Sequence, residues 1–139
     1  SFPKEIQKLN KGAKIFQNAA PMLVPLAEEG ETTGAEPFIK KYLAPFRSKN
    51  INALVLGCTH YPIFKKQIKK ALGNKIKIVS QDEIVPAKLK NYLARHPEIE
   101  KKLSKKHTAK ILVTDETKTI DTLARQWFGN VKPRFISLS

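Results

Sequence analysis

The chain contains 139 residues, 41% of them hydrophobic, and carries a formal charge of +14. This apolar content predicts a globular protein with a core and excludes a disordered chain. No run of about 18 apolar residues is present, so neither a membrane-spanning helix nor a membrane partner is expected. The single cysteine excludes an internal disulfide framework, and no apolar leader follows Ser1, so we expect a cytoplasmic protein.

The excess positive charge comes mostly from lysine, because arginine occurs only at positions 47, 95, 125 and 134. Proteins that read DNA bases favour arginine, and proteins that bind single strands interleave aromatic residues with cations. Neither pattern is present. We therefore interpret the lysines as solvated helix faces and expect no nucleic-acid partner, although the charge is compatible with attraction of an anionic substrate.

The first part of the chain predicts short strands that alternate with helices. Residues 1–11 are typical of a helix remnant or a disordered lead-in, and residues 13–17 of a short strand. A helix is expected from residue 21 to about 29. An amphipathic helix should follow over residues 36–48, with Pro45 weakening or kinking it.

The central stretch is a strand that leads directly into a helix. The apolar run 53–56 predicts a buried strand of a parallel sheet. Gly57 then permits a tight turn, and Pro62 suits the first position of a helix that continues to about residue 72. A thiol, a hydroxyl and an imidazole, from residues 58–60, therefore share a strand-to-helix turn, which is where open α/β sheets bind ligands.

The second part continues the same alternation. Strands are expected at residues 75–79, 109–113 and 134–138, and helices at residues 84–94 and 117–128. Strands that alternate with helices throughout indicate an α/β fold with a parallel sheet and right-handed crossovers.

Polar residues and prolines mark the limits of the predicted helix 84–94. Residues 80–83 can cap its start, Pro86 falls in its first turn, and His96 with the following proline ends it. A short charged helix or loop is expected next. His96 and His107 lie in polar stretches, and we expect both on the surface.

Seven consecutive residues carry a resemblance to a known family. Residues 56–62, LGCTHYP, resemble the second cysteine motif of glutamate racemases, in the aspartate/glutamate racemase family. Residues 22–30 resemble the proline-rich apolar segment that precedes this motif. Residues 111–138 resemble the closing strand, helix and strand of the family. The resemblance covers nearly the whole chain, but only about the C-terminal half of a racemase.

The resemblance implies a fold and a division of the chain. Racemases of this family have two similar α/β lobes with parallel sheets and an active site between them, and the chain returns to the first lobe near its end. Residues 1–80 would form part of the second lobe, which carries the Cys58 motif. Residues 81–139 would be the C-terminal return segment of the first lobe, so both lobes would be present only in part.

The resemblance also implies a reaction. Such enzymes interconvert L- and D-glutamate without a cofactor or a metal, using two cysteines on opposite faces of the substrate. Cys58 matches the second cysteine, which deprotonates the L enantiomer, and Thr59 and His60 match residues that contact glutamate. A thiolate suits removal of an α-proton because it is soft and weakly hydrated, and His60 is expected to adjust its protonation. The product would serve peptidoglycan biosynthesis, and so cell-wall biogenesis and cell shape in bacteria.

The chain also departs from the family pattern. The early Asp-Ser-Gly stretch and the first catalytic cysteine, in an Ala-Cys-Asn-Thr context, are absent. Residues 80–83 lack the glycine of the family's Asp-Ser-Gly-Ala, and Ala20 stands where the family often has a cysteine. We therefore expect a partner that is the missing N-terminal half with the other cysteine. The chain could also form a homodimer. We expect no racemisation of glutamate by this chain alone.

Other interpretations remain open. The chain could be a catalytically silent fragment that acts as a binding or assembly module, or part of another racemase, such as an aspartate racemase. A single cysteine after a strand is also often an inert small hydrophobic residue. A metal site lacks a second ligand pair near Cys58, and a redox site lacks a Cys-x-x-Cys arrangement. The uninterrupted motif favours a glutamate racemase.

Overall fold

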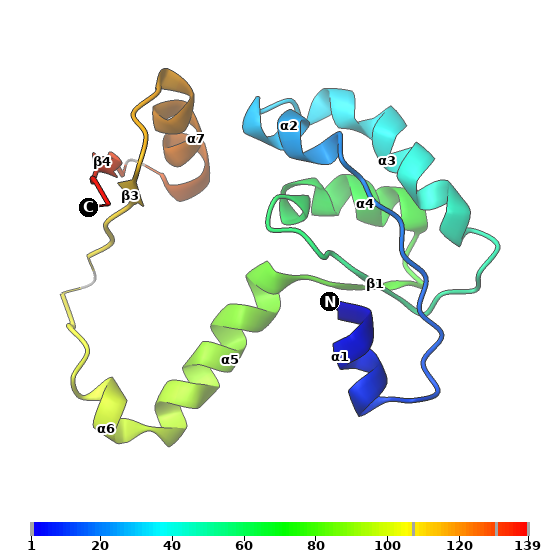
Figure 1. The fold of residues 1–139 in the computed structure, drawn as a ribbon, viewed down its shortest axis with the longest axis horizontal. Coiled ribbons are helices and arrows are strands. Elements are labelled where there is room, and N and C mark those ends of the chain that lie inside the picture. Colours follow the sequence, from blue (N-terminus) through cyan, green and yellow to red (C-terminus); the bar gives the residue numbers. More distant parts are fainter. Residues whose placement is uncertain (1, 107, 130, 139) are drawn as a thin grey trace.

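The computed structural model describes residues 2–106, 108–129 and 131–138, so the expected surface position of His107 lies outside the described residues. The chain up to β2 forms a packed unit, from which α5 leads away towards the C-terminal elements (Figure 1). The chain then returns, and α7 comes back beside the packed unit, where the ring of Trp127 approaches His60. No helix in the described ranges has both the length and the apolar character needed to cross a bilayer.

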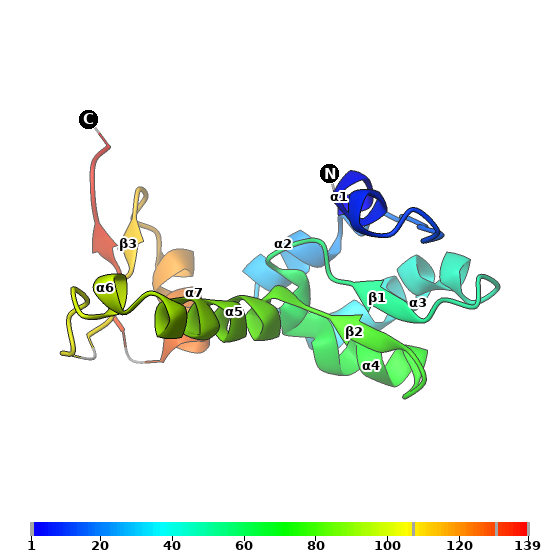
Figure 2. The same cartoon turned by 90° about the horizontal axis from the view of Figure 1, so that it is seen from below.

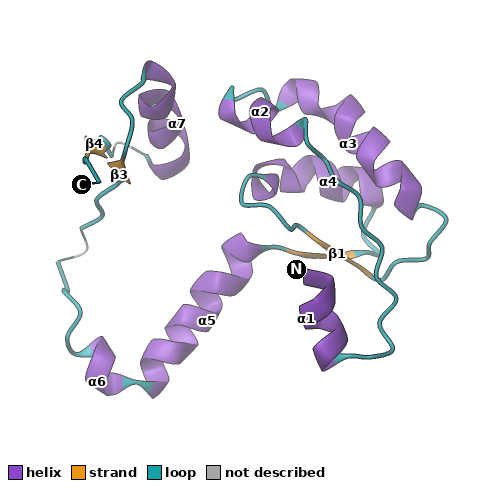
Figure 3. Ribbon diagram, viewed as in Figure 1, coloured by secondary structure: helices purple, strands orange, loops and turns teal. Residues whose placement is uncertain are grey.

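The packed unit alternates helices and strands. It contains helices α1 (Phe2–Leu9), α2 (Leu23–Glu28), α3 (Glu36–Leu43) and α4 (Lys65–Leu72), strands β1 (Ala53–Val55) and β2 (Lys77–Val79), and 3-10 turns η1 (Thr33–Ala35), η2 (Ala44–Phe46) and η3 (Tyr61–Phe64). The C-terminal portion contains α5 (Gln81–Arg95), α6 (Pro97–Glu100), β3 (Leu112–Val113), α7 (Lys118–Phe128) and β4 (Arg134–Phe135) (Figure 3).

Both sheets are parallel, which confirms the predicted α/β class. β1 pairs with β2, with Ala53 opposite Lys77 and Val55 opposite Val79, and β3 pairs with β4. α4 and α1 lie on opposite sides of the β1–β2 pair in both views (Figures 1 and 2). The strands are shorter than predicted. Each strand has only one partner strand in the described sheets, so it is fixed by one ladder of hydrogen bonds instead of two.

Two strand predictions need correction. Residues 13–17 are extended, but they join no sheet in the part of the chain that the structure describes. The run 53–56 was expected to be buried on both faces, yet only Leu56 is buried and Val55 is 40% exposed. Both segments line the same cavity, which leaves residues 13–17 without a ladder partner and part of β1 uncovered.

The hydrophobic core lies where α2, α3 and α4 pack together with β1. It is formed by buried apolar side chains: Ala20, Leu23, Ala27, Ala35, Ile39, Leu43, Leu56, Phe64 and Ile68. Phe64 has no exposed surface, and full burial of such a side chain contributes about 1.5–3 kcal/mol. Because Phe64 belongs to η3, the core anchors the turn that follows β1.

Prolines and a glycine shape the helices much as the sequence predicts. α3 changes to the 3-10 turn η2 at Ala44, next to Pro45, so the expected weakening of the helix at this proline is confirmed. α4 ends at Gly73, whose φ of 77° suits a residue without a side chain. α5 begins at Gln81, three residues before its predicted start, so the prediction for Pro86 was wrong. This proline lies in the second turn, where it removes one helical hydrogen bond.

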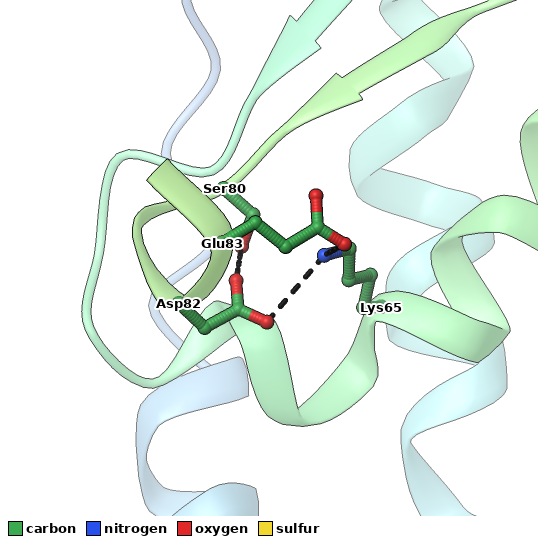
Figure 4. Close-up of polar contacts among 4 residues, drawn as sticks. All are labelled: Lys65, Ser80, Asp82 and Glu83. Carbon is green, nitrogen blue, oxygen red and sulfur yellow. Dashed lines mark hydrogen bonds and ion pairs between the residues drawn. The ribbon is translucent and has the colours of Figure 1, made fainter. Parts of the chain in front are cut away.

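Polar side chains from two helices hold the junction between β2 and α5 (Figure 4). Ser80 stands at the N-cap of α5 as predicted, but its hydroxyl donates to the side chain of Asp82 rather than capping a backbone amide. Lys65 pairs with Asp82 at 3.4 Å and also with Glu83. The Ser80 hydroxyl holds the pKa of Asp82 below its usual range, and hydrogen bonding to Glu83 raises the pKa of Lys65. These contacts tie the start of α5 to the start of α4.

Replacing Ser80 with alanine should destabilise the chain at neutral pH by about 1 kcal/mol, because the Asp82 carboxylate loses its hydrogen bond. The folded-state pKa of Asp82 is lowered, so this contribution is present above its unfolded value and is lost as the pH falls through its folded value. Urea unfolding of Ser80→Ala and of the exposed control Ser48→Ala should therefore differ at pH 7, and the difference should shrink as the pH falls below about 4. A difference that stays the same at low pH would contradict this account.

Candidate active site

The loop after β1 carries the cysteine at the position predicted from the sequence. The last ladder bond of the sheet runs from the Leu56 amide to the Val79 carbonyl, at 2.9 Å. Cys58 then lies in a bend, and the Tyr61 amide donates back to the Cys58 carbonyl at 3.3 Å. A 3-10 turn starts at Tyr61 and α4 follows it, so a helix does begin near Pro62, although its first turn is not α-helical.

The thiol and the imidazole of this loop are in contact. Cys58 Sγ lies 3.7 Å from Nδ1 of His60. Cys58 is partly buried, and the His60 side chain is 26% exposed. Thr59 lies between them in the chain and is exposed. The structure thus brings the side chains of Cys58 and His60 together, while the side chain of Thr59 on the same turn is exposed to solvent.

A carboxylate completes a chain of three polar groups. Nε2 of His60 lies 3.2 Å from Oε1 of Glu28, at the end of α2. If Nε2 donates its proton to Glu28, Nδ1 is left as an acceptor for the proton of Cys58. Carboxylate, imidazole and thiol in this order form the arrangement that orients a base beside a nucleophile or proton donor. The geometry therefore suits transfer of a proton from the thiol to the ring.

Glu28 is a site residue that sequence analysis missed. It is separated from His60 by 32 positions in the sequence, and it precedes a second glutamate, Glu29, with nothing to distinguish the two. Only the packing of α2 against η3 brings the Glu28 side chain to the ring. The one available signal was that Glu28 falls within residues 22–30, which resemble a segment of the racemase family.

Tyr61 and Trp127 connect this loop to other parts of the chain. The Tyr61 hydroxyl donates to the Ala20 carbonyl at 3.2 Å, which joins the cysteine loop to the start of α2. Burial raises the pKa of Tyr61, a shift that the bond to Ala20 partly offsets. The ring of Trp127, from α7, meets that of His60 edge to face at 6.4 Å. α7 therefore contributes to the surroundings of the imidazole, which sequence analysis did not predict.

The acidic and metal-binding side chains of the described residues do not gather into a metal site. No group of three or more His, Cys, Asp or Glu among them could hold a metal ion. A cavity of about 920 Å³ is lined by Gly57, Cys58 and Tyr61 together with β1. The chemistry available from this chain at the loop is therefore that of Cys58, His60 and Glu28.

Comparison with known proteins identifies relatives of the whole chain, although no family model matches it. The glutamate racemase of Sulfurihydrogenibium sp. is 35% identical over 141 aligned residues, which cover 100% of this chain and 51% of that protein. The glutamate racemase of Chlorobaculum tepidum is 34% identical over 92% of this chain and 47% of its own length. The chain thus spans about half the length of these relatives.

Solved structures of glutamate racemases also match nearly the whole chain. A glutamate racemase from Francisella tularensis, in complex with D-glutamate, matches with a TM-score of 0.83 and 27% identity. A glutamate racemase isoform from Bacillus anthracis matches with a TM-score of 0.81 and the same identity. Each comparison covers 99% of this chain and 52% of the solved chain. The likeness therefore involves the arrangement of nearly all of this chain, and again about half of the relatives.

Glu28 should increase the reactivity of the thiol, and the chain offers a matched control for this. Glu28→Gln removes the charge that holds the His60 ring, so alkylation of Cys58 by iodoacetamide at pH 7 should slow by about two- to fivefold, equivalent to about 0.4–1 kcal/mol. Glu29→Gln makes the same change at the neighbouring position and should leave the rate unaltered. Because Cys58 is the only cysteine, total thiol loss measures it directly. Equal rates in both variants would refute the contact.

Tyr61 should lose its proton at higher pH than a free tyrosine. Its folded-state pKa is raised, so its contribution to stability is present below the unfolded value of about 10 and is lost as the pH rises towards the folded value. In an absorbance titration at 295 nm, Tyr61→Phe should remove the component that ionises at the highest pH. Tyr92→Phe should retain that component. Its persistence in Tyr61→Phe would show that another tyrosine is responsible.

Proposed function

The chain is a homologue of the glutamate racemases over about half of their length, and on this premise we propose that it supplies one of two thiol bases that interconvert L- and D-glutamate. The observation that carries the proposal is the contact series from Cys58 through His60 to Glu28. A thiol is useful as a base only as the thiolate, and this series offers a place for its proton. The Francisella relative was solved with D-glutamate, which fits glutamate as the substrate.

The proposed reaction is a proton exchange at one carbon. His60 takes the proton of Cys58, and the thiolate removes the α-proton of L-glutamate. The carbanion that results takes a proton from a second base on its other face, which gives D-glutamate. Proton transfer by a positioned side chain accounts for about 10²–10⁴-fold in rate. No cofactor or metal is needed for this exchange. We propose that Thr59, which is exposed beside Cys58, contacts the substrate.

The second base is a group other than Cys58, His60 and Glu28. Cys58 is the only cysteine of the chain. We propose that the other half of a racemase, with its own cysteine, is the partner that supplies this base. The resulting D-glutamate would serve peptidoglycan biosynthesis in the cytoplasm of a bacterium.

The same partner would explain the division of the chain into residues 1–80 and 81–139, which we propose are parts of two lobes. Among the described residues, the buried side chains of the main core all lie between Ala20 and Ile68. In contrast, no residue of α5, which the structure describes throughout, is buried. Apolar side chains are exposed along the C-terminal portion: Ile84, Val85, Leu89, Tyr92, Leu112, Phe128 and Phe135. Such an apolar surface is typical of an element that is covered by further chain.

A binding or assembly module without catalysis is the second candidate function. The specific observation that favours it is this exposed apolar surface, which could also be covered by another copy of the chain in a homodimer. The two candidates differ in their requirement for the thiol. Catalysis depends on Cys58, whereas assembly through α5 and α7 does not.

Racemisation should require both this chain and the unmatched half of a racemase. We expect no inversion of L-glutamate, followed by circular dichroism, with this chain alone, since one face of the α-carbon has no base. Co-expression with the half of the Sulfurihydrogenibium racemase to which this chain does not align should restore measurable activity. Cys58→Ser should then lower the rate by at least about 10²-fold, because a hydroxyl is far less acidic than a thiol.

Two further variants separate the thiol from its neighbours. His60→Asn should lower the rate less than Cys58→Ser, because the imidazole adjusts the thiol without carrying the substrate proton. Glu29→Gln serves as the control and should retain the rate. Turnover in Cys58→Ser close to that of the unmodified chain would place the base elsewhere. Full activity from this chain alone would refute the two-base account.

A further inference from the structure

Helix α7 approaches the site through two neighbouring side chains. The ring of Trp127 lies 6.4 Å from that of His60, measured between ring centres, with the two planes at 77°. Gln126 lies against Gly30, so close that a methyl group added there would contact its Oε1 at 3.4 Å. Gly30 directly follows the end of α2, the helix that carries Glu28. α7 therefore lies against both partners of the carboxylate–imidazole pair (Figure 1).

These contacts are not part of the hydrophobic core. The main core includes no residue of α7, a helix that the structure describes throughout. Within this helix only Ala124 is buried, and Trp127 lies one turn further along on the same side. Trp127 itself is 38% exposed. The largest side chain of α7 thus meets the imidazole at the surface and does not fill space in the interior.

The two polar contacts of His60 leave its ring weakly fixed. The terminal torsion of histidine has broad minima, so the ring can turn at little cost. Its Nε2 faces Glu28, a side chain that is 52% exposed, so water competes for this contact. Its Nδ1 faces Cys58 Sγ at 3.7 Å, which is long for a strong hydrogen bond. A third contact is needed to hold the plane of the ring.

The indole of Trp127 is suited to provide this third contact. Aromatic rings that meet edge to face attract each other beyond the effect of buried area, because the positive edge of one ring meets the negative face of the other. Rotation of the His60 ring would lose this arrangement. The indole also covers part of the imidazole and so reduces the access of water to the contact with Glu28.

We propose that Trp127 is a positioning residue, which holds the His60 ring so that Nε2 faces Glu28 while Nδ1 faces Cys58. In this orientation the proton of Sγ passes to Nδ1, and the imidazolium that forms keeps its other proton directed at the Glu28 carboxylate. When the ring turns, one of the two contacts is lost and the thiol has no acceptor for its proton. Trp127 touches neither the thiol nor the α-carbon in this account. Its importance for racemisation rests on the proposed function.

The orientation of the ring can be followed by NMR. Trp127 is the only tryptophan of the chain, and its indole protons should show a nuclear Overhauser effect to the ring protons of His60. The His60 Nε2 proton should exchange with water at least about fivefold faster in Trp127→Leu than in the unmodified chain. Trp127→Phe keeps an aromatic ring and should retain most of the protection. Phe128→Leu makes a similar change at the next, more exposed position of α7 and should leave the exchange rate unaltered.

The consequence for the thiol can be measured by alkylation. Trp127→Leu should slow the reaction of Cys58 with iodoacetamide at pH 7 by about two- to fivefold, as Glu28→Gln does, and Trp127→Phe should restore most of the rate. In a chain that already carries Glu28→Gln, Trp127→Leu should have little further effect, because both changes act through the same ring. A purely structural role would give independent effects that multiply. A faster reaction in Trp127→Leu would show that the indole only shields the thiol and would overturn the proposal.

The measurement on the unmodified chain decides when a variant fails to fold. If the helix content of Trp127→Leu falls in circular dichroism, the ring-to-ring Overhauser effect and the phenylalanine variant provide the test. Absence of that effect would overturn the proposal, as would unchanged imidazole exchange in a folded Trp127→Leu. Both readouts use the chain alone and do not require racemisation. If they behave as expected but co-expression restores no turnover, the proposed function fails and the role of Trp127 stands. If turnover is restored and both readouts ignore Trp127, only the present inference fails.

Discussion

The hydrogen bond from the Leu56 amide to the Val79 carbonyl determines where the chain leaves the sheet, and the geometry of the site depends on it. A slip of one residue in this register would exchange the faces of every side chain in β1. Leu56 would leave the core, and the loop with Cys58 and His60 would start from the wrong side. The buried Phe64 and the Tyr61 bond to Ala20 hold the loop from its other end. The thiol is therefore positioned by rigid elements on both sides of a short loop.

The site combines groups from three parts of the chain that share no sequence pattern. Cys58 and His60 belong to the loop after β1, Glu28 to the end of α2, and Trp127 to α7. α7 reaches His60 only because the chain leaves the packed unit along α5 and then comes back (Figure 1). The contacts of Ser80 and Lys65 lie at the base of α5, where this departure begins (Figure 4).

The open surfaces of the chain have a common physical origin. A strand edge with unpaired amides and a helix with exposed apolar side chains are both costly in water, and native proteins usually cover them. Here β1 has such an edge, and α5 has exposed Ile84, Val85 and Leu89. Both features lie outside the core that α2, α3 and α4 form with β1. The core is thus complete enough to position Cys58, while the edge of β1 and the apolar side chains of α5 remain exposed.

The sequence by itself determined the α/β class with a parallel sheet, the presence of strands at β1 and β2, the strand-to-helix turn at Cys58 and the resemblance to glutamate racemases. These depend on local signals: an apolar run, a glycine, a proline at a helix start and a motif of seven residues. The division into two lobes, the catalytic roles of Cys58 and His60, and the substrate contacts of Thr59 and His60 stay predictions.

Only the tertiary structure decided that Glu28, and not Glu29, meets His60, that Ser80 bonds to Asp82, and that residues 13–17 stand apart from β1. Contacts between distant residues depend on how helices pack and which strands are neighbours. Periodicity within one segment carries no information about either.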